Sequence, residues 1–165
     1  MTTDAIIGGA ALALTLYGMA ATRKHNRLSV KPSLVSRNHT NWTDEGMIYS
    51  YDLCNFGIGP AVIRKFTLLL DGKPFCPDTG SPVAGLVKTV FSGELEFLVR
   101  NTSFPNAGYI LPANQTYPVA EIFFPKLTAG QESKFEQLKA RMNLCFEYES
   151  LYGDWFVFDT REKAH

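Results

Sequence analysis

The first apolar segment of the chain is an unbroken run from Ala5 to Ala21 without a charged side chain. At about 1.5 Å per residue, a helix of this run measures roughly 26 Å, close to the ~30 Å thickness of a hydrocarbon core. The run is rich in alanine and glycine rather than leucine, so its insertion as an isolated helix is only marginally favourable. We predict a transmembrane helix over residues 5–22, preceded by a short exposed N-terminus at residues 1–4.

Four basic residues follow the apolar run: Arg23, Lys24, Arg27 and Lys31. Secretion signals carry positive charge before their apolar segment, whereas this chain begins Met-Thr-Thr-Asp, so its pattern is the inverse. With residues 23–27 as a basic collar, the positive-inside rule predicts a single-pass anchor with its N-terminus outside and the remaining chain in the cytoplasm. A cleaved signal peptide and a buried helix of a soluble protein are the alternatives.

Small residues recur within the predicted anchor at Gly8, Ala11, Thr15 and Gly18. Steps of three and four residues place them on one face of a helix. Membrane helices associate through such seams because small side chains allow close approach of two backbones. We expect this face to pack against another membrane helix. The alternative is that an alanine-rich helix has small residues on every face.

After Leu28 the pattern changes to short runs with a period of two, which is typical of β-strands. Met47, Tyr49 and Tyr51 alternate with Ser50 and Asp52, as in a strand with one buried face. Turn-forming residues separate the runs, and Asp71-Gly72 is a strong hairpin signal. The seven predicted strands are Leu28–Val35, Met47–Leu53, Ala61–Leu70, Leu95–Val99, Val119–Phe124, Leu144–Ser150 and Trp155–Phe158.

Two helices interrupt the predicted strands. The first has Ser81 as N-cap, Pro82 in its first turn and Gly93 at its end, which are preferred residues at these positions. Its inward stripe comprises Val83, Leu86, Val87, Val90 and Phe91. The second begins at Thr128, where Gln131 completes a capping box. Its inward side chains are predicted to be Phe135, Leu138 and Met142.

This organisation predicts a mainly β protein. Seven short strands separated by turns are typical of an immunoglobulin-like sandwich. We assign residues 28–160 to one such domain with two short inserted helices, and residues 161–165 to a free C-terminal tail. The length of 165 residues leaves no room for a second full core.

Composition narrows the possible functions. Sixteen basic and sixteen acidic side chains cancel, so the chain has no global field that would hold a nucleic acid. The cysteines, Cys54, Cys76 and Cys145, are too widely spaced for a zinc or redox motif, and we expect no metal. Cys54 and Cys145 both lie in predicted strands. Buried free thiols are favoured over an inter-sheet disulfide between them.

No catalytic arrangement is visible. His25, His39 and His165 lie in the collar, in a polar segment and at the terminus, where nothing orients them. Glu147, Glu149 and Asp154 form a possible carboxylate cluster, but a solvated strand face explains them better. The aromatic residues Trp42, Tyr49, Tyr51, Tyr152 and Trp155 are better explained by core packing than by a sugar-binding platform. We predict no enzyme activity, no cofactor and no small-molecule substrate.

The segment YSYDLCNFGIGPAVIRKFTLLLDGK, residues 49–73, resembles the strand-turn-strand core of bacterial immunoglobulin-like, adhesion-related sandwich domains. The matching positions are Asn55, Gly57, Gly59, Pro60, Ala61, Asp71 and Gly72. Glycine permits a positive φ in the turn, and proline fixes the chain that leaves it. The whole chain is also similar to uncharacterised bacterial proteins with one N-terminal membrane helix before such a domain. The resemblance implies a fold but no activity.

The sequence therefore predicts a non-enzymatic accessory or scaffold protein of the bacterial inner membrane. Its helix packs with other membrane helices in the lipid bilayer, and its β domain binds a membrane or cytoplasmic protein. The alternative is a periplasmic ligand-binding or adhesion module tethered to the membrane, which requires the opposite orientation.

Overall fold

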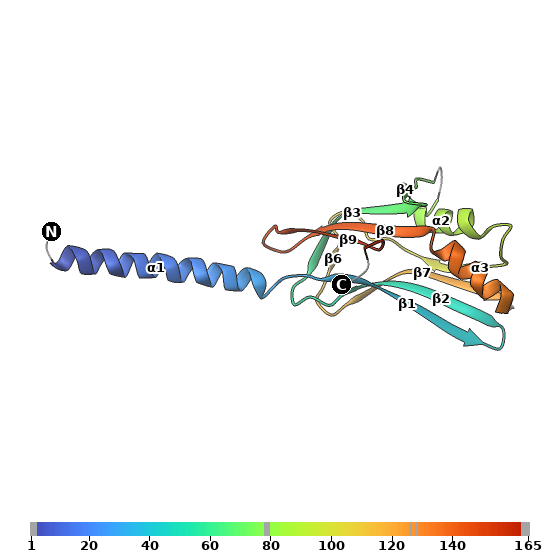
Figure 1. Ribbon diagram of the computed structural model, residues 1–165, viewed down its shortest axis with the longest axis horizontal. Helices are drawn as coiled ribbons and strands as arrows, with labels where there is room; N and C mark the ends of the chain where they lie inside the picture. The colour runs from blue at the N-terminus through green and yellow to red at the C-terminus, as the bar shows by residue number, and fades with distance from the viewer. Residues whose placement is uncertain (1–2, 78–79, 126, 128, 163–165) are drawn as a thin grey trace.

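The computed structural model of the chain describes residues 3–77, 80–125, 127 and 129–162 (Figure 1). These residues form three helices and nine strands. The helices are α1 (Thr3–Leu28), α2 (Pro82–Phe91) and α3 (Ala129–Lys139). The strands are β1 (Leu34–Thr43), β2 (Gly46–Asn55), β3 (Ala61–Leu70), β4 (Lys73–Pro74), β5 (Leu98–Thr102), β6 (Ile110–Leu111), β7 (Thr116–Pro125), β8 (Met142–Glu149) and β9 (Trp155–Asp159).

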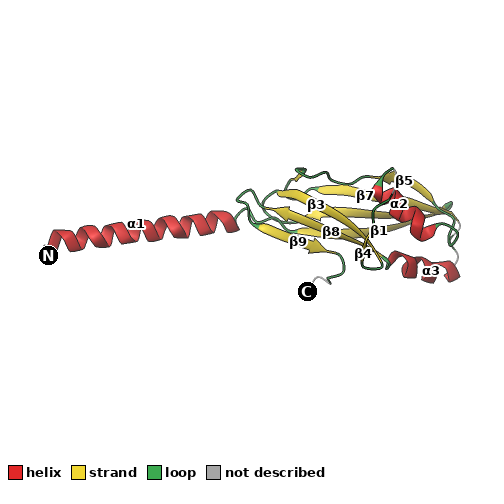
Figure 2. Cartoon of the chain, turned by 90° about the horizontal axis from the view of Figure 1, so that it is seen from above, coloured by secondary structure: helices red, strands yellow, loops and turns green. Residues whose placement is uncertain are grey.

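Helix α1 projects from one end of the β domain, along the long axis of the domain (Figures 1 and 2). The helix continues through the predicted collar as far as Leu28, and its described side chains from Ile7 onward are exposed. Within the described residues, none of the helices combines the length and the hydropathy that are needed to cross a membrane. The predicted transmembrane helix over residues 5–22 is therefore present as a helix but unsupported as a span.

The nine strands form two antiparallel sheets that face each other (Figure 2). One sheet has the order β1-β2-β7-β5, and the other has the order β4-β3-β8-β9 with β6 paired to the start of β3. Alternate side chains of the two sheets fill the space between them, including Leu53, Ile63, Phe124 and Phe146, all buried. The mainly β class that the alternating pattern predicts is confirmed.

Helices α2 and α3 close the end of the sandwich that lies opposite α1, which we call the far end (Figure 1). Phe91 of α2 and Phe135 of α3 meet Phe124 of β7, with ring centroids 5.1 and 5.0 Å apart. Edge-to-face contacts of this kind stabilise a core beyond simple area burial. Both helices therefore belong to the hydrophobic core.

The predicted strand set is wrong in number, because the structure has nine strands rather than seven. The two additional strands, β4 and β6, contain two residues each, too few to show a period. The first predicted strand is also misplaced: Leu28 ends α1, and β1 runs from Leu34 to Thr43. The second half of β1 is exposed on both faces, so it lacks the alternation that identifies a strand.

Helix α2 is confirmed in detail. Its N-cap is Ser81, Pro82 is its first residue, and Gly93 follows its end with a φ of 78°. The five stripe residues that the sequence predicts are all buried. In α3, Phe135 and Leu138 are buried as predicted, but Met142 lies in β8 because the helix ends at Lys139. The predicted start at Thr128 lies outside the described residues.

Candidate functional site

The junction between α1 and the β domain is built around Asn55, the last residue of β2. Its side chain is fully buried, and its Oδ1 accepts hydrogen bonds from the backbone N–H groups of Ser33 at 3.1 Å and Gly57 at 3.0 Å. Its Nδ2 donates to the carbonyl oxygens of Gly59, at 2.9 Å, and Leu111, at 3.0 Å. One amide thereby joins the segment after α1, the turn after β2 and the end of β6.

Glycine is needed at positions 57 and 59 because the backbone of residues 30–33 lies too close to leave room for a side chain, and not because the turn needs an unusual backbone conformation. The expectation that Gly57 and Gly59 adopt a positive φ is wrong, since neither does. A Cβ at Gly57 would overlap the backbone of Lys31 and Ser33, and one at Gly59 would overlap the carbonyl group of Val30. The turn therefore packs backbone against backbone on the segment after α1.

The other predicted turn residues lie at two places in the second sheet. Pro60 leads from the junction into β3. Asp71 and Gly72 join β3 to β4 at the far end, with φ values of 51° and 77°. A two-residue hairpin turn with both φ values positive follows the right-handed twist of the strands. The Asp-Gly hairpin is present as predicted.

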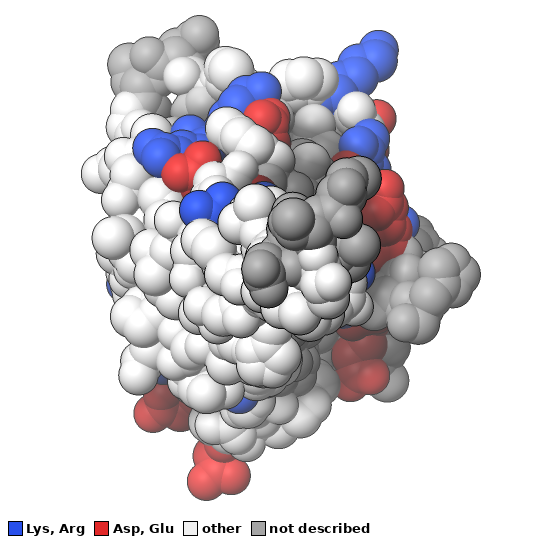
Figure 3. Space-filling model, turned by 90° about the vertical axis from the view of Figure 1, so that its left-hand side faces the viewer, with Lys and Arg blue, Asp and Glu red and all other residues white. Residues whose placement is uncertain are grey.

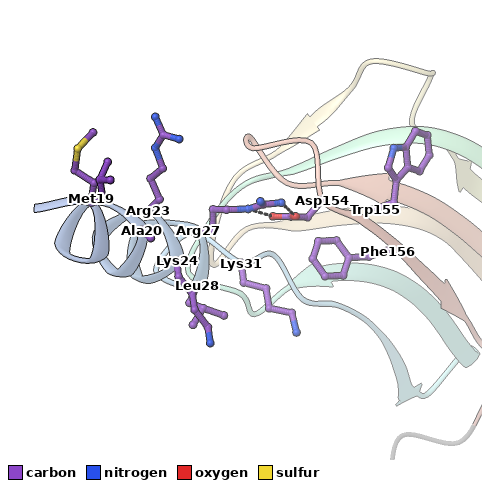
Figure 4. A pocket seen from close by; sticks show the side chains of 11 residues that line it. Met19, Ala20, Arg23, Lys24, Arg27, Leu28, Lys31, Asp154, Trp155 and Phe156 are labelled. Carbon is purple, nitrogen blue, oxygen red and sulfur yellow. Dashed lines mark hydrogen bonds and ion pairs between the residues drawn. The ribbon is translucent and has the colours of Figure 1, made fainter. Parts of the chain in front are cut away.

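A groove with a volume of about 830 Å³ lies between the last turns of α1 and the hairpin of β8 and β9 (Figure 4). The four predicted collar residues, Arg23, Lys24, Arg27 and Lys31, all line it. The remaining lining residues are Leu16, Met19, Ala20, Leu28, Asp154, Trp155 and Phe156. The groove thus combines basic side chains from α1 and the segment after it with aromatic side chains from β9.

Arg27 and Asp154 form an ion pair across this groove (Figure 4). The guanidinium group of Arg27 donates two hydrogen bonds to the carboxylate, from Nε to Oδ2 at 3.2 Å and from Nη2 to Oδ1. Ser150 holds the carboxylate from the other side, since its hydroxyl donates to Asp154 Oδ2 at 3.2 Å. The hydrogen bond from Arg27 keeps the pKa of Asp154 below its usual value, with a smaller contribution from Ser150.

Lys31 lies over the ring of Phe156, with Nζ 5.5 Å from the ring centroid. This is the distance of a cation–π contact. Together with the pair of Arg27 and Asp154, it joins α1 and the segment after it to the start of β9. Arg23 and Lys24 line the groove without an ion pair to any described residue.

The predicted packing seam of α1 faces open space. A Cβ at Gly8 or Gly18 meets no atom within 4 Å. The Thr15 hydroxyl donates to the carbonyl oxygen of Ala11 at 2.9 Å, within its own helix. The seam therefore makes no contact with the β domain among the described residues.

The possible carboxylate cluster is not assembled. Glu147 pairs with Lys65, Nζ to Oε1 2.9 Å, Glu149 pairs with Arg64, and Asp154 pairs with Arg27. Each carboxylate is therefore neutralised by a separate cation. Among the described residues, no three His, Cys, Asp or Glu side chains form a group that can hold a metal ion.

The predicted aromatic set is divided between different regions. Tyr49 is buried and Tyr51 is half-buried between the sheets, whereas Trp42, Tyr152 and Trp155 are exposed. Trp42 is the last residue but one of β1, at the far end, while Tyr152 and Trp155 lie at the hairpin near α1 (Figure 1). These side chains form no common binding platform. The prediction of core packing is correct for Tyr49 and Tyr51 and wrong for the other three, because they lie near strand ends or in a turn where no second layer covers them.

The candidate histidines and cysteines make no site. His25 and His39 are exposed on α1 and β1, and His165 lies outside the described residues. All three cysteines are free, with Cys54 buried, Cys145 half-buried and Cys76 exposed. Burial raises the pKa of the Cys145 thiol, so it is not an activated nucleophile.

A smaller cavity of about 230 Å³ lies between the sheets near α3. Tyr51 lines it, and its hydroxyl makes no hydrogen bond of normal geometry to any described residue. Burial raises the pKa of Tyr51 to about 12, although Ser36 partly opposes this effect. The cavity is mostly apolar, with Leu86 and Val119 among its lining residues.

Sequence reasoning missed the exposed apolar side chains of the turn after β2. Phe56 and Ile58 lie in the turn that follows Asn55, whose predicted features concern only the backbone. The available signal is that both are large apolar residues in a turn, where polar residues are the rule, and both are exposed.

Comparison with known proteins leaves the chain without an assigned family. It matches no model of a known protein family, and no curated protein matches its sequence.

Proposed function

We propose that this protein is a non-enzymatic accessory or scaffold protein of a bacterial inner membrane. In this proposal α1 lies in the lipid bilayer beside a helix of another membrane protein. The β domain lies on the cytoplasmic side and binds a protein partner. We further assign the domain to the immunoglobulin-like class.

The observation that carries the proposal is the exposure of α1. Its large apolar side chains Ile7, Leu12, Leu16, Tyr17 and Met19 are all at least half exposed. Successive helical residues are rotated by about 100°, so these side chains cover most of the circumference. A helix that is apolar on all sides is normally buried in a protein core or in a membrane. The β domain does not bury α1, so the bilayer is the environment that suits it.

The order of the strands supports the immunoglobulin-like assignment. Such domains place the first, second, fifth and fourth strands in one sheet and the third, sixth and seventh in the other. When the two-residue strands β4 and β6 are set aside, β1-β2-β7-β5 and β3-β8-β9 follow this order. Domains of this class serve many functions, so the assignment favours no activity.

Cys76 allows a direct test of location and orientation, because it is the exposed cysteine of the three. The chain is expressed in a bacterium, and its membranes are separated by flotation. We expect the protein in the membrane fraction, and labelling of Cys76 by an impermeant maleimide only after the cells are permeabilised. The Cys76→Ser variant controls for labelling elsewhere.

Two results would contradict the proposal. If the protein stays with the soluble fraction instead of floating with the membranes, α1 does not lie in the bilayer. Labelling of Cys76 in intact cells would place the domain in the periplasm and favour a ligand-binding or adhesion module. The partner is tested by purification in mild detergent, where a monomer without any associated protein would contradict the scaffold role.

A further inference from the structure

The end of the β domain next to α1, which we call the near end, carries most of the exposed apolar side chains of the domain. It consists of residues 56–60, 103–115 and 150–155. Among the residues after Leu28 that the structure describes, ten large apolar side chains are exposed, and seven of them lie here. Phe56 and Ile58 come from the first segment, and Tyr109 and Ile110 from the second. Leu151, Tyr152 and Trp155 come from the third.

The near end also has almost no charge. Its three segments contain one charged residue, Asp154, which is paired with Arg27. By contrast, the turns of the far end carry Asp44, Glu45, Asp71, Glu94 and Glu96. Figure 3 looks at the molecule from the α1 side, and most of the visible face is neither acidic nor basic. The two ends of one domain therefore present different surfaces.

Several contacts hold the near end at the level of the last turn of α1. The turn that carries Phe56 and Ile58 packs on residues 30–33, and the N–H of Ile58 donates to the carbonyl oxygen of Lys31 at 3.1 Å. The Asn55 side chain ties the end of β6, at Leu111, to this turn. Trp155 lines the same groove as Met19 and Arg23. A membrane or protein that contacts the C-terminal turns of α1 would therefore also contact the near end.

We infer that the near end of the β domain docks on an anionic phospholipid bilayer, with its apolar loops in the interface and lipid phosphate groups on the basic groove. The inference rests on the proposed membrane location of α1 and deepens it. Trp and Tyr side chains favour the level of the lipid headgroups. Basic residues beside a membrane helix attract anionic lipid. The groove lining includes the basic residues Arg23, Lys24 and Lys31. Its single acidic residue, Asp154, is already paired with Arg27.

The two tryptophans make the inference testable, since Trp155 lies at the near end and Trp42 at the far end. Each is left as the sole tryptophan by the substitutions Trp42→Phe and Trp155→Phe in the full chain. Both variants are reconstituted into vesicles of phosphatidylcholine and phosphatidylglycerol with brominated acyl chains. Bromine quenches only fluorophores that contact the bilayer. We expect quenching of Trp155 by about twofold or more and little quenching of Trp42.

A second pair of variants tests the loops themselves. Ile58→Asp places a charge on an exposed side chain of the near end, and Leu98→Asp places one on an exposed side chain of the far end. Because both positions are exposed, both variants should fold. In the Trp42→Phe background, we expect Ile58→Asp to reduce the quenching of Trp155 and Leu98→Asp to leave it unchanged.

The outcomes separate this inference from the proposed function. If the chain floats with the vesicles but Trp155 is quenched no more than Trp42, the docking surface is wrong and the near end belongs to a protein partner. Equal quenching of Trp155 in vesicles that lack phosphatidylglycerol would overturn the role of lipid charge. If the chain does not float with the vesicles, both the proposed membrane location and the docking surface fail.

Discussion

Asn55 Oδ1 accepts a hydrogen bond from the backbone N–H of Ser33 at 3.1 Å, which joins the end of β2 to the segment that leads out of α1. Replacement by alanine leaves several buried backbone groups without partners, and each unsatisfied group is costly. We expect Asn55→Ala to lower the free energy of unfolding by roughly 2–4 kcal/mol. Urea denaturation measures the change. Asn41→Ala, at an exposed position of β1, serves as the control and should have little effect.

Gly59 is expected to tolerate no side chain. A Cβ there would overlap the backbone of Val30, which cannot move without displacing the segment after α1. We predict that Gly59→Ala destabilises the domain by about 3 kcal/mol or more. At Gly130 in α3, a Cβ meets nothing within 4 Å, so Gly130→Ala should be neutral or slightly stabilising. Thermal unfolding compares the two variants. Equal midpoints would contradict the close packing of Gly59 on the backbone of Val30.

Tyr51 and Tyr148 provide a matched pair of buried hydroxyl groups. The Tyr148 hydroxyl accepts a hydrogen bond from the N–H of Leu34 at 3.4 Å, whereas that of Tyr51 has no such bond to any described residue. We expect Tyr148→Phe to destabilise the domain by about 0.5–1.5 kcal/mol and Tyr51→Phe to be neutral or stabilising. Chemical denaturation of both variants gives the comparison. A clear loss of stability in Tyr51→Phe would indicate a hydrogen bond of this hydroxyl, either to Ser36 or to a buried water.

The ion pair between Arg27 and Asp154 should stabilise the junction in a pH-dependent way. Arg27 lowers the pKa of Asp154 from its ordinary value of 3.8, so in this range the unfolded chain binds more protons than the folded one. The stabilisation is therefore complete above pH 3.8 and is lost as the pH falls through the folded pKa. Arg27→Ala should be less stable than wild type near neutral pH and equally stable in strong acid.

Denaturation of both proteins across this pH range checks the prediction. Arg23→Ala is the control, because Arg23 lines the same groove without contributing to the pKa of Asp154. A difference between wild type and Arg27→Ala that persists unchanged into strong acid would show that Arg27 acts through packing instead.

Gly18 and Gly9 test the proposed helix partner. They are nine residues apart, so they lie on opposite faces of α1, and a Cβ at either meets nothing within 4 Å. A leucine at Gly18 should keep a second helix away from the seam and weaken association by about 1–2 kcal/mol, or roughly tenfold. Gly9→Leu should leave association unchanged. Chemical cross-linking in membranes measures the association of each variant. Equal effects of the two substitutions would show that the seam is not the contact face.

The elements that were predicted from the sequence are those whose local signals agree. Helix α2 has its cap, its first-turn proline and its apolar stripe in register, so Ser81 to Gly93 was readable without the fold. Strand β3 is a mostly apolar run that is closed by Asp-Gly, and its bounds match the prediction. In β1, residues after Ser36 are exposed on both faces, and a strand without a buried face has no period to detect.

The candidate site was predicted in parts but not as a whole. The sequence groups the basic residues at the end of α1 and places Asp154 in a hairpin. Nothing local indicates that Arg27 meets Asp154, because they are 127 positions apart. The glycines of the junction were recognised, but their role depends on Val30 and Lys31, which only the fold brings against them.

The backbone bonds between residues 31–33 and the Asn55 turn leave almost no slack between α1 and the sandwich. A protein tethered by a loose linker responds little to the rotation of its anchor. Here the β domain must follow any tilt or rotation of α1 as a rigid body. Its largest displacement falls on the far end, around α2 and α3 (Figure 1).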